Sequence, residues 1–308
     1  MDVIIELANV SKSYNEIKAV ENLSFKLKKG EILGFLGPNG AGKTTAMKMI
    51  TGYMPPDTGT IKVKNEDILK DPVKARISIG YLPENNPLYL DMTVAEYLNF
   101  IAEMRGIENR EKAIDSALTK CGIKNVSHRI INHLSKGYKQ RVGLAQAIIH
   151  DPEILILDEP VNGLDPKQIT EIRNLIKELG KEKTVILCSH ILSEVEAVAD
   201  RVLIINNGKI AADDTIENLR ERSKGSNIFV LDIIDETADI AEKLNTLENV
   251  KKVEKVHSGL YRIFAAGNKE TGHSIFVLAA SNNWKVVQLY LEGNSLENMF
   301  LNLTEGGK

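Results

Sequence analysis

The sequence predicts an α/β fold: a parallel core sheet covered by helices, a flanking antiparallel sheet, an inserted helical subdomain and a small C-terminal α+β domain. Unbroken apolar runs predict buried parallel strands, "EILGFLG" at 31–37, "EILILD" at 153–158 and "TVILCS" at 184–189. Between the last two, "KQITEIRNLIKELG" repeats apolar residues at helical intervals and ends at Gly180. This alternation of strands and helices is typical of a sheet covered on both faces.

Other patterns surround this parallel core. The segments "IIELANV", "ENLSFKL" and "TIKVK" at 4–10, 21–27 and 60–64 are half-alternating, which predicts an antiparallel sheet beside the parallel one. From about 88 to 150 a helical pattern replaces the strand pattern, which predicts an inserted helical subdomain. "VLIINNGKIAADD" predicts a hairpin that turns at Asn207-Gly208.

A small polar stretch, "RSKGS" at 222–226, predicts a linker, so we expect one domain at 1–221 and a second at 222–308. The second domain has a rhythm of its own. Strands are expected at 227–233, 250–256, 260–266 and 284–291, and helices at 237–247, 271–281 and 295–303. The order βαββαβ followed by a last helix is typical of a ferredoxin-like sandwich.

The composition excludes several classes of protein. A net charge of −3 over 308 residues gives no reason to expect nucleic acid as a partner. Cys121 and Cys188 lack any CxxC or Cys/His spacing, so we expect neither a metal site built on cysteine nor a disulfide. The chain opens with no signal-peptide pattern, and no apolar run approaches the roughly 20 residues of a membrane span. A function at a membrane would therefore require another chain.

The segment "GPNGAGKTT" fits the phosphate-binding pattern G-x-x-x-x-G-K-[ST] and lies between a strand and a helix. Glycines let backbone N–H groups curve around an anion, and the following helix points its positive end at it. We expect Lys43 to reach the β- and γ-phosphates, Thr44 to bind Mg²⁺ and Thr45 to bind a phosphate oxygen. The expected phosphate-binding residues are Gly37, Pro38, Asn39, Gly40, Ala41, Gly42, Lys43, Thr44 and Thr45. The motif predicts a P-loop NTPase.

Acidic and imidazole side chains end two of the buried strands. Asp158 and Glu159 close "ILILDEP", and His190 follows "TVILCS". Because the carboxyl ends of parallel strands meet at one edge of a sheet, these side chains should lie beside the P-loop. Asp158 suits Mg²⁺, Glu159 is placed to polarise an attacking water, and His190 is expected near a γ-phosphate.

Five elements occur in a specific order: the P-loop, "LSKGYKQR", "LILDEP", "GLDP" and "CSH". Their order resembles the nucleotide-binding subunit of ATP-binding-cassette (ABC) transporters over about residues 1–220. The segment "YLPENNPLY" is similar to a bacterial branch of type-two ABC exporters that includes gliding-motility-like ATPases. The C-terminal domain resembles a small accessory domain of that branch, for which we expect a structural or regulatory role.

This resemblance implies an ATPase that binds ATP and Mg²⁺ and forms a head-to-tail homodimer. It also implies a separate membrane-spanning permease and a location at the cytoplasmic face of the cell membrane. The transported substrate, and the choice between a homodimer and a heterodimer, stay open at the level of sequence.

The resemblance also implies roles for single residues. Tyr14 matches the aromatic residue that stacks on adenine, and Val20 matches a small apolar residue that lines the nucleotide. Glu159 matches the catalytic carboxylate and His190 the histidine that contacts the γ-phosphate. Asp165 matches the aspartate of the loop that crosses between the two subunits.

Two segments depart from the family pattern. Glu84 stands where most members have a glutamine that reaches Mg²⁺ and the attacking water, and a carboxylate cannot donate as an amide does. The usual Leu-Ser-Gly-Gly-Gln segment has Lys136 and Tyr138 at its third and fifth positions. Ser135 and Gly137, the two residues that contact phosphate in the family, remain, so the resemblance implies that the segment binds the partner's ATP. Ser135 is also expected to be the N-cap of a helix, which alone would be an ordinary helix start.

Two other classes of function compete with transport. A soluble ABC ATPase that acts on ribosomes or DNA typically carries two cassettes, a long coiled-coil insertion or basic arms, and this chain shows none of these. A nucleotide-binding regulator without turnover would lack the catalytic acid, whereas Glu159 is present. Both classes are therefore less favoured than a transport ATPase.

Overall fold

The computed structural model describes residues 2–223, 227–234, 239–265, 269–292 and 300. Contacts divide the chain into two compact units, Met1–Ile216 and Glu217–Lys308. The small polar stretch at 222–226 predicts a boundary between residues 221 and 222. Helix α8 (Ile216–Ser223) runs across both positions. No described helix combines the length and the apolar character that crossing a membrane requires.

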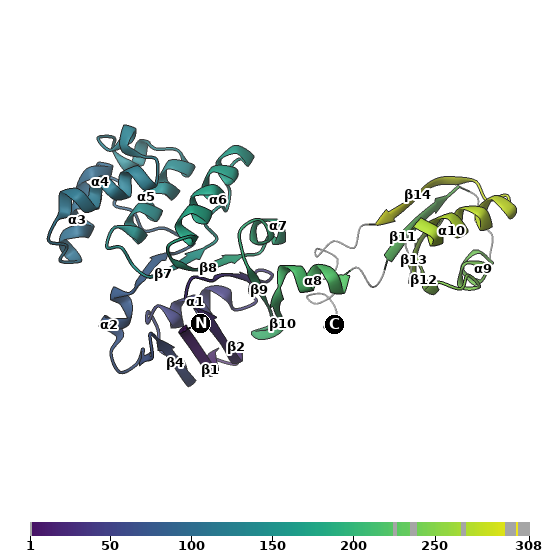
Figure 1. Cartoon of the computed structure of the whole chain (residues 1–308), viewed down its shortest axis with the longest axis horizontal. Helices are drawn as coiled ribbons and strands as arrows, with labels where there is room; N and C mark the ends of the chain where they lie inside the picture. The colour runs from purple at the N-terminus through teal and green to yellow at the C-terminus, as the bar shows by residue number, and fades with distance from the viewer. Residues whose placement is uncertain (1, 224–226, 235–238, 266–268, 293–299, 301–308) are drawn as a thin grey trace. The chain divides into compact units, whose positions relative to one another are not determined.

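A six-stranded sheet forms the centre of the first unit, as the apolar runs predict (Figure 1). Its strands, in spatial order, are β10 (Lys209–Thr215), β9 (Arg201–Asn206), β3 (Ile32–Leu36), β8 (Thr184–Ser189), β7 (Ile154–Asp158) and β6 (Ile79–Leu82). Neighbouring strands are parallel except β9 and β10, which form the expected hairpin. Asn207 and Gly208 have φ values of 48° and 76°, as a two-residue turn between twisted strands requires. Strand β6 has no counterpart among the predicted strands.

The antiparallel sheet is also confirmed. It runs in the order β2 (Ile17–Lys28), β1 (Val3–Tyr14), β4 (Thr58–Val63) and β5 (Glu66–Asp67). Helix α1 (Lys43–Ile50) packs between the two sheets, because its buried Met47 and Ile50 share one apolar core with Phe25 and Phe35. The short helix α2 (Pro72–Ile77) follows β5.

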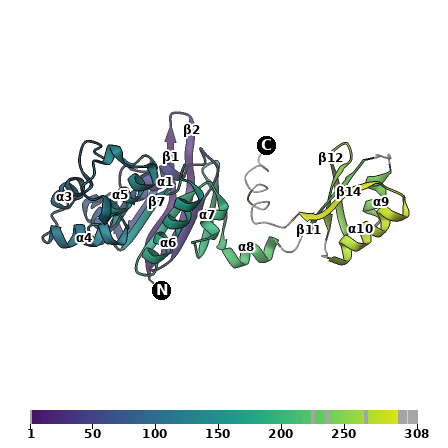
Figure 2. The same cartoon turned by 90° about the horizontal axis from the view of Figure 1, so that it is seen from above.

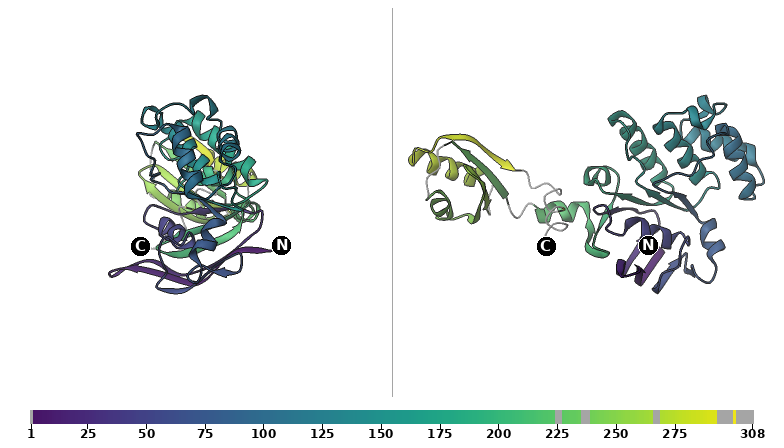
Figure 3. Two further views of the ribbon diagram at one scale, coloured as in Figure 1. Left: turned by 90° about the vertical axis from the view of Figure 1, so that its left-hand side faces the viewer. Right: turned by 180° about the vertical axis from the view of Figure 1, so that it is seen from behind.

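Helices cover the other face of the core sheet. Three of them, α3 (Val94–Met104), α4 (Arg110–Lys120) and α5 (Lys136–Ile148), gather at one end of the unit as the predicted helical subdomain (Figures 1 and 2). Two further helices on this face are α6 (Pro166–Gly180) and α7 (Leu192–Glu196), visible from behind in Figure 3. A second apolar core joins α3, α4, α5 and α6 to strands β7 and β8.

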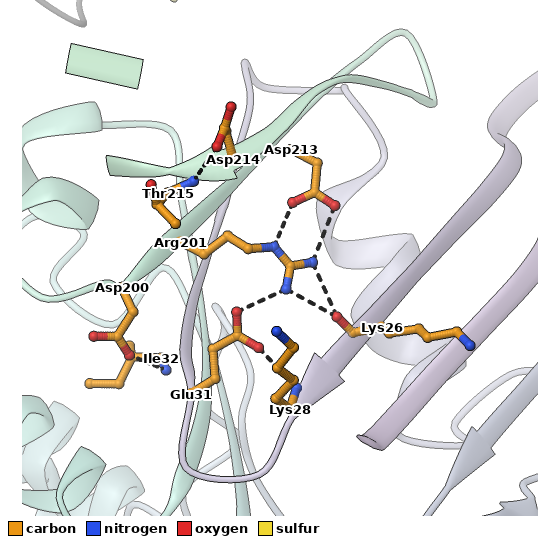
Figure 4. Close-up of polar contacts among 9 residues, drawn as sticks. All are labelled: Lys26, Lys28, Glu31, Ile32, Asp200, Arg201, Asp213, Asp214 and Thr215. Carbon is orange, nitrogen blue, oxygen red and sulfur yellow. Dashed lines mark hydrogen bonds and ion pairs between the residues drawn. The ribbon is translucent and has the colours of Figure 1, made fainter. Parts of the chain in front are cut away.

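One arginine ties together segments that are distant in the sequence (Figure 4). Arg201, at the start of β9, donates from Nε and Nη2 to Asp213 of β10 at 2.5 and 3.1 Å. Its Nη1 donates to Glu31 Oε1 at 2.8 Å, and Nη1 and Nη2 both donate to the carbonyl of Lys26 on β2 at 3.1 Å. Glu31 in turn accepts from the amide of Lys28 at 2.9 Å. The guanidinium group therefore joins the core sheet to the antiparallel sheet.

The second unit has the predicted ferredoxin-like order of elements. They are β11 (Asn227–Ile233), α9 (Ile240–Asn245), β12 (Val250–His257), β13 (Leu260–Ala265), α10 (Lys269–Ser281) and β14 (Val286–Glu292). The strands lie in the order β12-β13-β11-β14 with all neighbours antiparallel. Leu231, Ile263, Ile275 and Trp284 belong to its separate core. The helix predicted at 295–303 lies outside the described residues apart from Phe300.

Candidate functional site

The P-loop connects β3 to α1 and depends on glycine at two points. Gly42 has a φ of 105°, and a Cβ atom on it would lie 2.3 Å from the carbonyl oxygen of Ala19. A Cβ atom on Gly37 would lie 2.4 Å from the carbonyl oxygen of Ile205. No side chain caps the N-terminus of α1. The loop therefore packs backbone against backbone and leaves the positive end of α1 available to an anion.

Lys43 is buried beneath this loop, with 6% of its surface exposed. Its Nζ donates to the carbonyl of Gly37 at 2.8 Å and to that of Pro38 at 3.2 Å, and it lies 3.5 Å from Glu159 Oε1. The ammonium group is thus held by the loop and by the acid at the end of β7. A phosphate entering the loop would meet a cation that is already in place.

Glu159 and His190 face one another at the edge of the sheet. Glu159 has a φ of 50°, uncommon for a residue with a side chain, and its amide donates to the carbonyl of Cys188 at 3.0 Å. This turn brings its carboxylate to His190, whose Nδ1 lies 2.9 Å from Oε2. The structure thus brings together the carboxylate and the imidazole that follow two separate strands in the sequence.

Asp158 is fully buried, and neither of its carboxylate oxygens has a hydrogen-bond partner. The pKa of Asp158 is raised to about 6, chiefly by burial and to a smaller extent by the charges of Glu159 and Glu84. The side chain of Thr44 opposes this rise, although its hydroxyl does not meet the geometry of an ordinary hydrogen bond. A cation beside these oxygens would favour the ionised carboxylate.

A cavity of about 390 Å³ opens over the P-loop. Nine expected phosphate-binding, catalytic and metal residues line it: these are Asn39, Gly40, Gly42, Lys43, Thr44, Thr45, Glu84, Glu159 and His190. Ala19 and Asn162 also line it, and none of the sequence motifs predicts either residue. The alternation along β2 could have identified Ala19. Val20 is fully buried, and neighbouring residues of a strand face opposite sides, so Ala19 faces away from the core.

Several expected site residues do not line this cavity. Val20 belongs to the apolar core, and Tyr14 is 44% exposed, with its hydroxyl 3.2 Å from the sulfur of Met54. Gly37, Pro38, Ala41 and Asp158 form its surroundings and do not contribute to its lining. The geometry alone therefore assigns no adenine contact to Tyr14 or Val20.

The segment at Ser135 lies at a different place. Ser135 is the N-cap of α5, as predicted, and its hydroxyl accepts from the amide of Tyr138 at 3.4 Å. Asp165 is the N-cap of α6 and accepts from the amide of Gln168 at 2.9 Å. A Cβ atom on Gly137 would lie 2.7 Å from the Gln168 side chain, and one on Gly163 would lie 2.1 Å from Lys136 Nζ.

The two helix starts are therefore in contact. None of the residues Ser135, Lys136, Gly137, Tyr138 and Asp165 lines the cavity of this chain.

Known proteins resemble this chain over its length. The family model described as ABC transporter matches residues 20–162. The bacitracin transport ATP-binding protein BcrA of Bacillus licheniformis is 35% identical over 311 residues, which cover 100% of this chain and 99% of that protein. The linearmycin resistance ATP-binding protein LnrL of Bacillus subtilis is 35% identical over 306 residues, 98% of each.

Solved structures agree with these sequence matches. One described as the ATP-binding subunit of an ABC transporter has a TM-score of 0.65 at 30% identity, over 71% of this chain and 92% of that one. A dimeric ATP-binding cassette in a post-hydrolysis state, bound to ADP and Pi, has a TM-score of 0.64 at 25% identity, over 69% of this chain and 99% of that one. The chain therefore belongs to the family of ABC transporter ATP-binding proteins, and it is an ATPase that binds ATP.

Proposed function

We propose that two copies of this chain close head to tail on two ATP molecules and drive a separate permease that exports a substrate. The observation that carries this proposal is the separation of two phosphate-binding features. The cavity over the P-loop is lined by Lys43 and Glu159, whereas the capped helix start at Ser135 lies outside it. A second copy would bring its Ser135 over this cavity. The dimeric relative bound to ADP and Pi supports such an arrangement.

The residues around the cavity would act mainly by position and charge. Lys43 and the P-loop amides would hold the β- and γ-phosphates, and Ser135 and Gly137 of the other copy would bind the same γ-phosphate. Glu159 would orient the attacking water and accept its proton, while His190, 2.9 Å from it, would hold the carboxylate and contact the γ-phosphate. Asp165 would lie at the junction of the two copies.

The donor set also fits Mg²⁺, which prefers oxygen ligands and keeps several waters. Asp158 offers two buried oxygens without a partner, and Thr44 and Glu84 line the cavity beside it. Among the residues that the structure describes, no three His, Cys, Asp or Glu side chains gather as a metal site. Phosphate oxygens would therefore supply much of the coordination. When bound, Mg²⁺ would neutralise charge on the β- and γ-phosphates.

An exposed apolar surface after the Glu84 loop suits the permease. Tyr89 and Phe100 are 53% and 37% exposed, with their rings edge to face at 5.4 Å. Leu90 and Met104 beside them are 43% and 65% exposed. Such a patch marks a surface for another protein. We place the chain at the cytoplasmic face of the membrane through this contact.

The names of two relatives, for bacitracin transport and linearmycin resistance, favour an antibiotic as the cargo. Expression of the chain with its permease in a sensitive host should then raise the concentration of the antibiotic needed to stop growth. The variant Glu159→Gln should not.

Trapping the dimer tests the proposal directly. Glu159→Gln should bind ATP but hydrolyse it slowly, so that size-exclusion chromatography with ATP shows a dimer. Co-purification of the permease with the wild-type chain tests the second part. A correctly folded Glu159→Gln that stays monomeric with saturating ATP would refute closure.

A further inference from the structure

The loop that carries Glu84 is fastened to helix α5 on both sides of that residue. Asn86 Nδ2 donates to the carbonyl of Lys139 at 3.5 Å. A Cβ atom on Gly143 would lie 1.8 Å from Nδ2 of Asn86 and 2.7 Å from Cδ1 of Leu82. Leu82 and Asn86 thus flank Glu84 symmetrically, and both press on the same glycine. An alanine at position 143 would force the Asn86 amide out of its place.

The contact continues as a stripe along α5. Lys139, Gly143 and Ala147 follow one another at intervals of four, so they lie on one face of the helix. At the far end of the stripe, a Cβ atom on Gly80 of β6 would lie 2.1 Å from the carbonyl oxygen of Ala147. Strand β6 and its following loop are therefore held against α5 at three successive turns, and glycine makes two of these contacts possible.

The placement of Asn86 has a cost that packing alone does not explain. Its Oδ1 is buried without a hydrogen-bond partner. Buried amides with an unpaired acceptor are rare in native structures. The missing side chain of Gly143 leaves a notch on the surface of α5, and Asn86 fills it. An apolar side chain of similar size would fill this Gly143 notch without an unpaired polar atom. We therefore expect the Asn86 amide to have a role beyond packing.

The N-terminus of α5 suggests what this role is. The amide of Lys139 donates to the carbonyl of Ser135 at 3.0 Å, and Ser135 caps the helix. The stripe therefore begins one turn from the residue that we expect to meet the partner's nucleotide. At the other side, Glu84 lines the ATP cavity of its own chain.

We propose that Asn86 is a positioning residue: it holds the Glu84 loop on the Gly143 notch of α5, so that α5 sets the place of Glu84 in the cavity. Engagement of Ser135 by the partner's ATP then reaches the chain's own Glu84 through one helix. This inference rests on the proposed functions of Glu84 and Ser135.

A double-mutant cycle with Asn86→Ala and Gly143→Ala tests the notch, with Asn85→Ala as the matched control from the same loop. Each of the two single variants should lower kcat by about 10- to 100-fold, as is typical when a residue that holds a metal ligand in place is changed. The KM for ATP should stay within about twofold of the wild-type value. The Mg²⁺ concentration for half-maximal activity should rise in both. The double variant should be no slower than the slower single variant, because Asn86, the nearest neighbour of a Cβ atom at 143, is then absent and only the side chain of Leu82 has to shift.

Thermal unfolding tests the contact between Asn86 and Gly143 independently of its effect on ATP turnover. Gly143→Ala should lower the melting temperature by about 2–4 °C more in the wild-type background than in the Asn86→Ala background, where Leu82 is the remaining close neighbour and the helix propensity of alanine offsets part of the cost. Additive effects on the melting temperature would overturn the notch.

Three outcomes of the activity measurements decide the rest. Wild-type kcat and Mg²⁺ dependence in Asn86→Ala would overturn the positioning role. Glu84→Ala with wild-type kinetics beside a slow Asn86→Ala would overturn the route through Glu84. By contrast, wild-type turnover in Glu159→Gln would contradict the proposed catalytic function and not the notch, which the unfolding cycle tests by itself.

Discussion

The ammonium group of Lys43 lies 3.5 Å from the carboxylate oxygen Oε1 of Glu159, and each of the two residues is 6% exposed. Lys43 also donates to two carbonyls of its own loop. Protein groups thus surround the cation that we propose to bind the phosphates of a nucleotide. If Lys43 has this role, nucleotide binding exchanges its contacts with Glu159 and the loop carbonyls for contacts with phosphate oxygens.

The first prediction follows from this exchange. Glu159→Gln removes the anion that competes with phosphate for Lys43 and repels it, so ADP should bind about 3- to 10-fold more tightly. Calorimetry with ADP measures this effect apart from hydrolysis. Glu178→Gln, at an exposed position on α6, is the control and should leave the affinity unchanged. Equal or weaker binding of ADP by Glu159→Gln would show that the pair does not oppose the nucleotide.

A second prediction concerns Ser135. Ser135→Arg should abolish ATP turnover, because a large side chain would block the approach of the helix start to the partner's γ-phosphate. Binding of ATP to a single chain should stay within about twofold, since Ser135 does not line the chain's own cavity. Fluorescent-nucleotide titration and a phosphate-release assay measure the two quantities. Thr119→Arg, at an exposed site on α4, is the control and should change neither quantity. If Ser135→Arg lost ATP binding to the same extent as turnover, Ser135 would act on its own chain's nucleotide and not on the partner's.

Stability provides a third prediction, at Arg201. Its side chain is 18% exposed and makes ion pairs with Glu31 and Asp213. Arg201→Met should lower the free energy of unfolding by about 2–3 kcal/mol, because two carboxylates lose their partner. Lys26→Ala is a matched control, since Arg201 uses only the backbone carbonyl of Lys26, and should cost less than about 0.5 kcal/mol. Urea unfolding of the three proteins gives the values, and equal costs would rule out the network as a source of stability.

The fourth prediction uses His150. Its Nε2 lies 3.1 Å from the carbonyl oxygen of Ile79, and burial, followed by the charge of Arg105, lowers the pKa of His150 to about 4. An unfolded histidine has a pKa of about 6.5, so the unfolded chain binds more protons between these values. The contribution of His150 to stability is therefore complete above pH 6.5 and is lost as the pH falls toward 4.

His150→Gln should consequently lose less stability on acidification than the wild type. Between pH 7.5 and 5.0 the difference between the two proteins should shrink by about 1–2 kcal/mol in urea unfolding. Asp158, whose raised pKa acts in the opposite direction, is present in both proteins and cancels in this difference. His128→Gln changes an exposed histidine and serves as the control. Parallel pH curves for wild type and His150→Gln would contradict the assignment.

The strands that end at the site could be predicted because both of their faces are covered, which leaves long apolar runs in the sequence. Strand β6 was missed for a related reason. Gly80 is needed where Ala147 approaches, and a glycine in so short a strand weakens the pattern. The contact between Asn86 and Gly143 could not be predicted, because it joins a loop and a helix through tertiary packing alone. Motif order located the cavity, whereas the choice between Ala19 and Val20 depended on which way a strand faces.

The contacts of Gly137 with Gln168, and of Lys136 with Gly163, have a consequence for association. The starts of α5 and α6 are ordered against each other within a single chain. The conformational entropy of these two loops is therefore lost during folding and not when two copies meet. In the proposed dimer, a preorganised surface of this kind would let weak contacts form a complex that dissociates readily after each round of ATP hydrolysis.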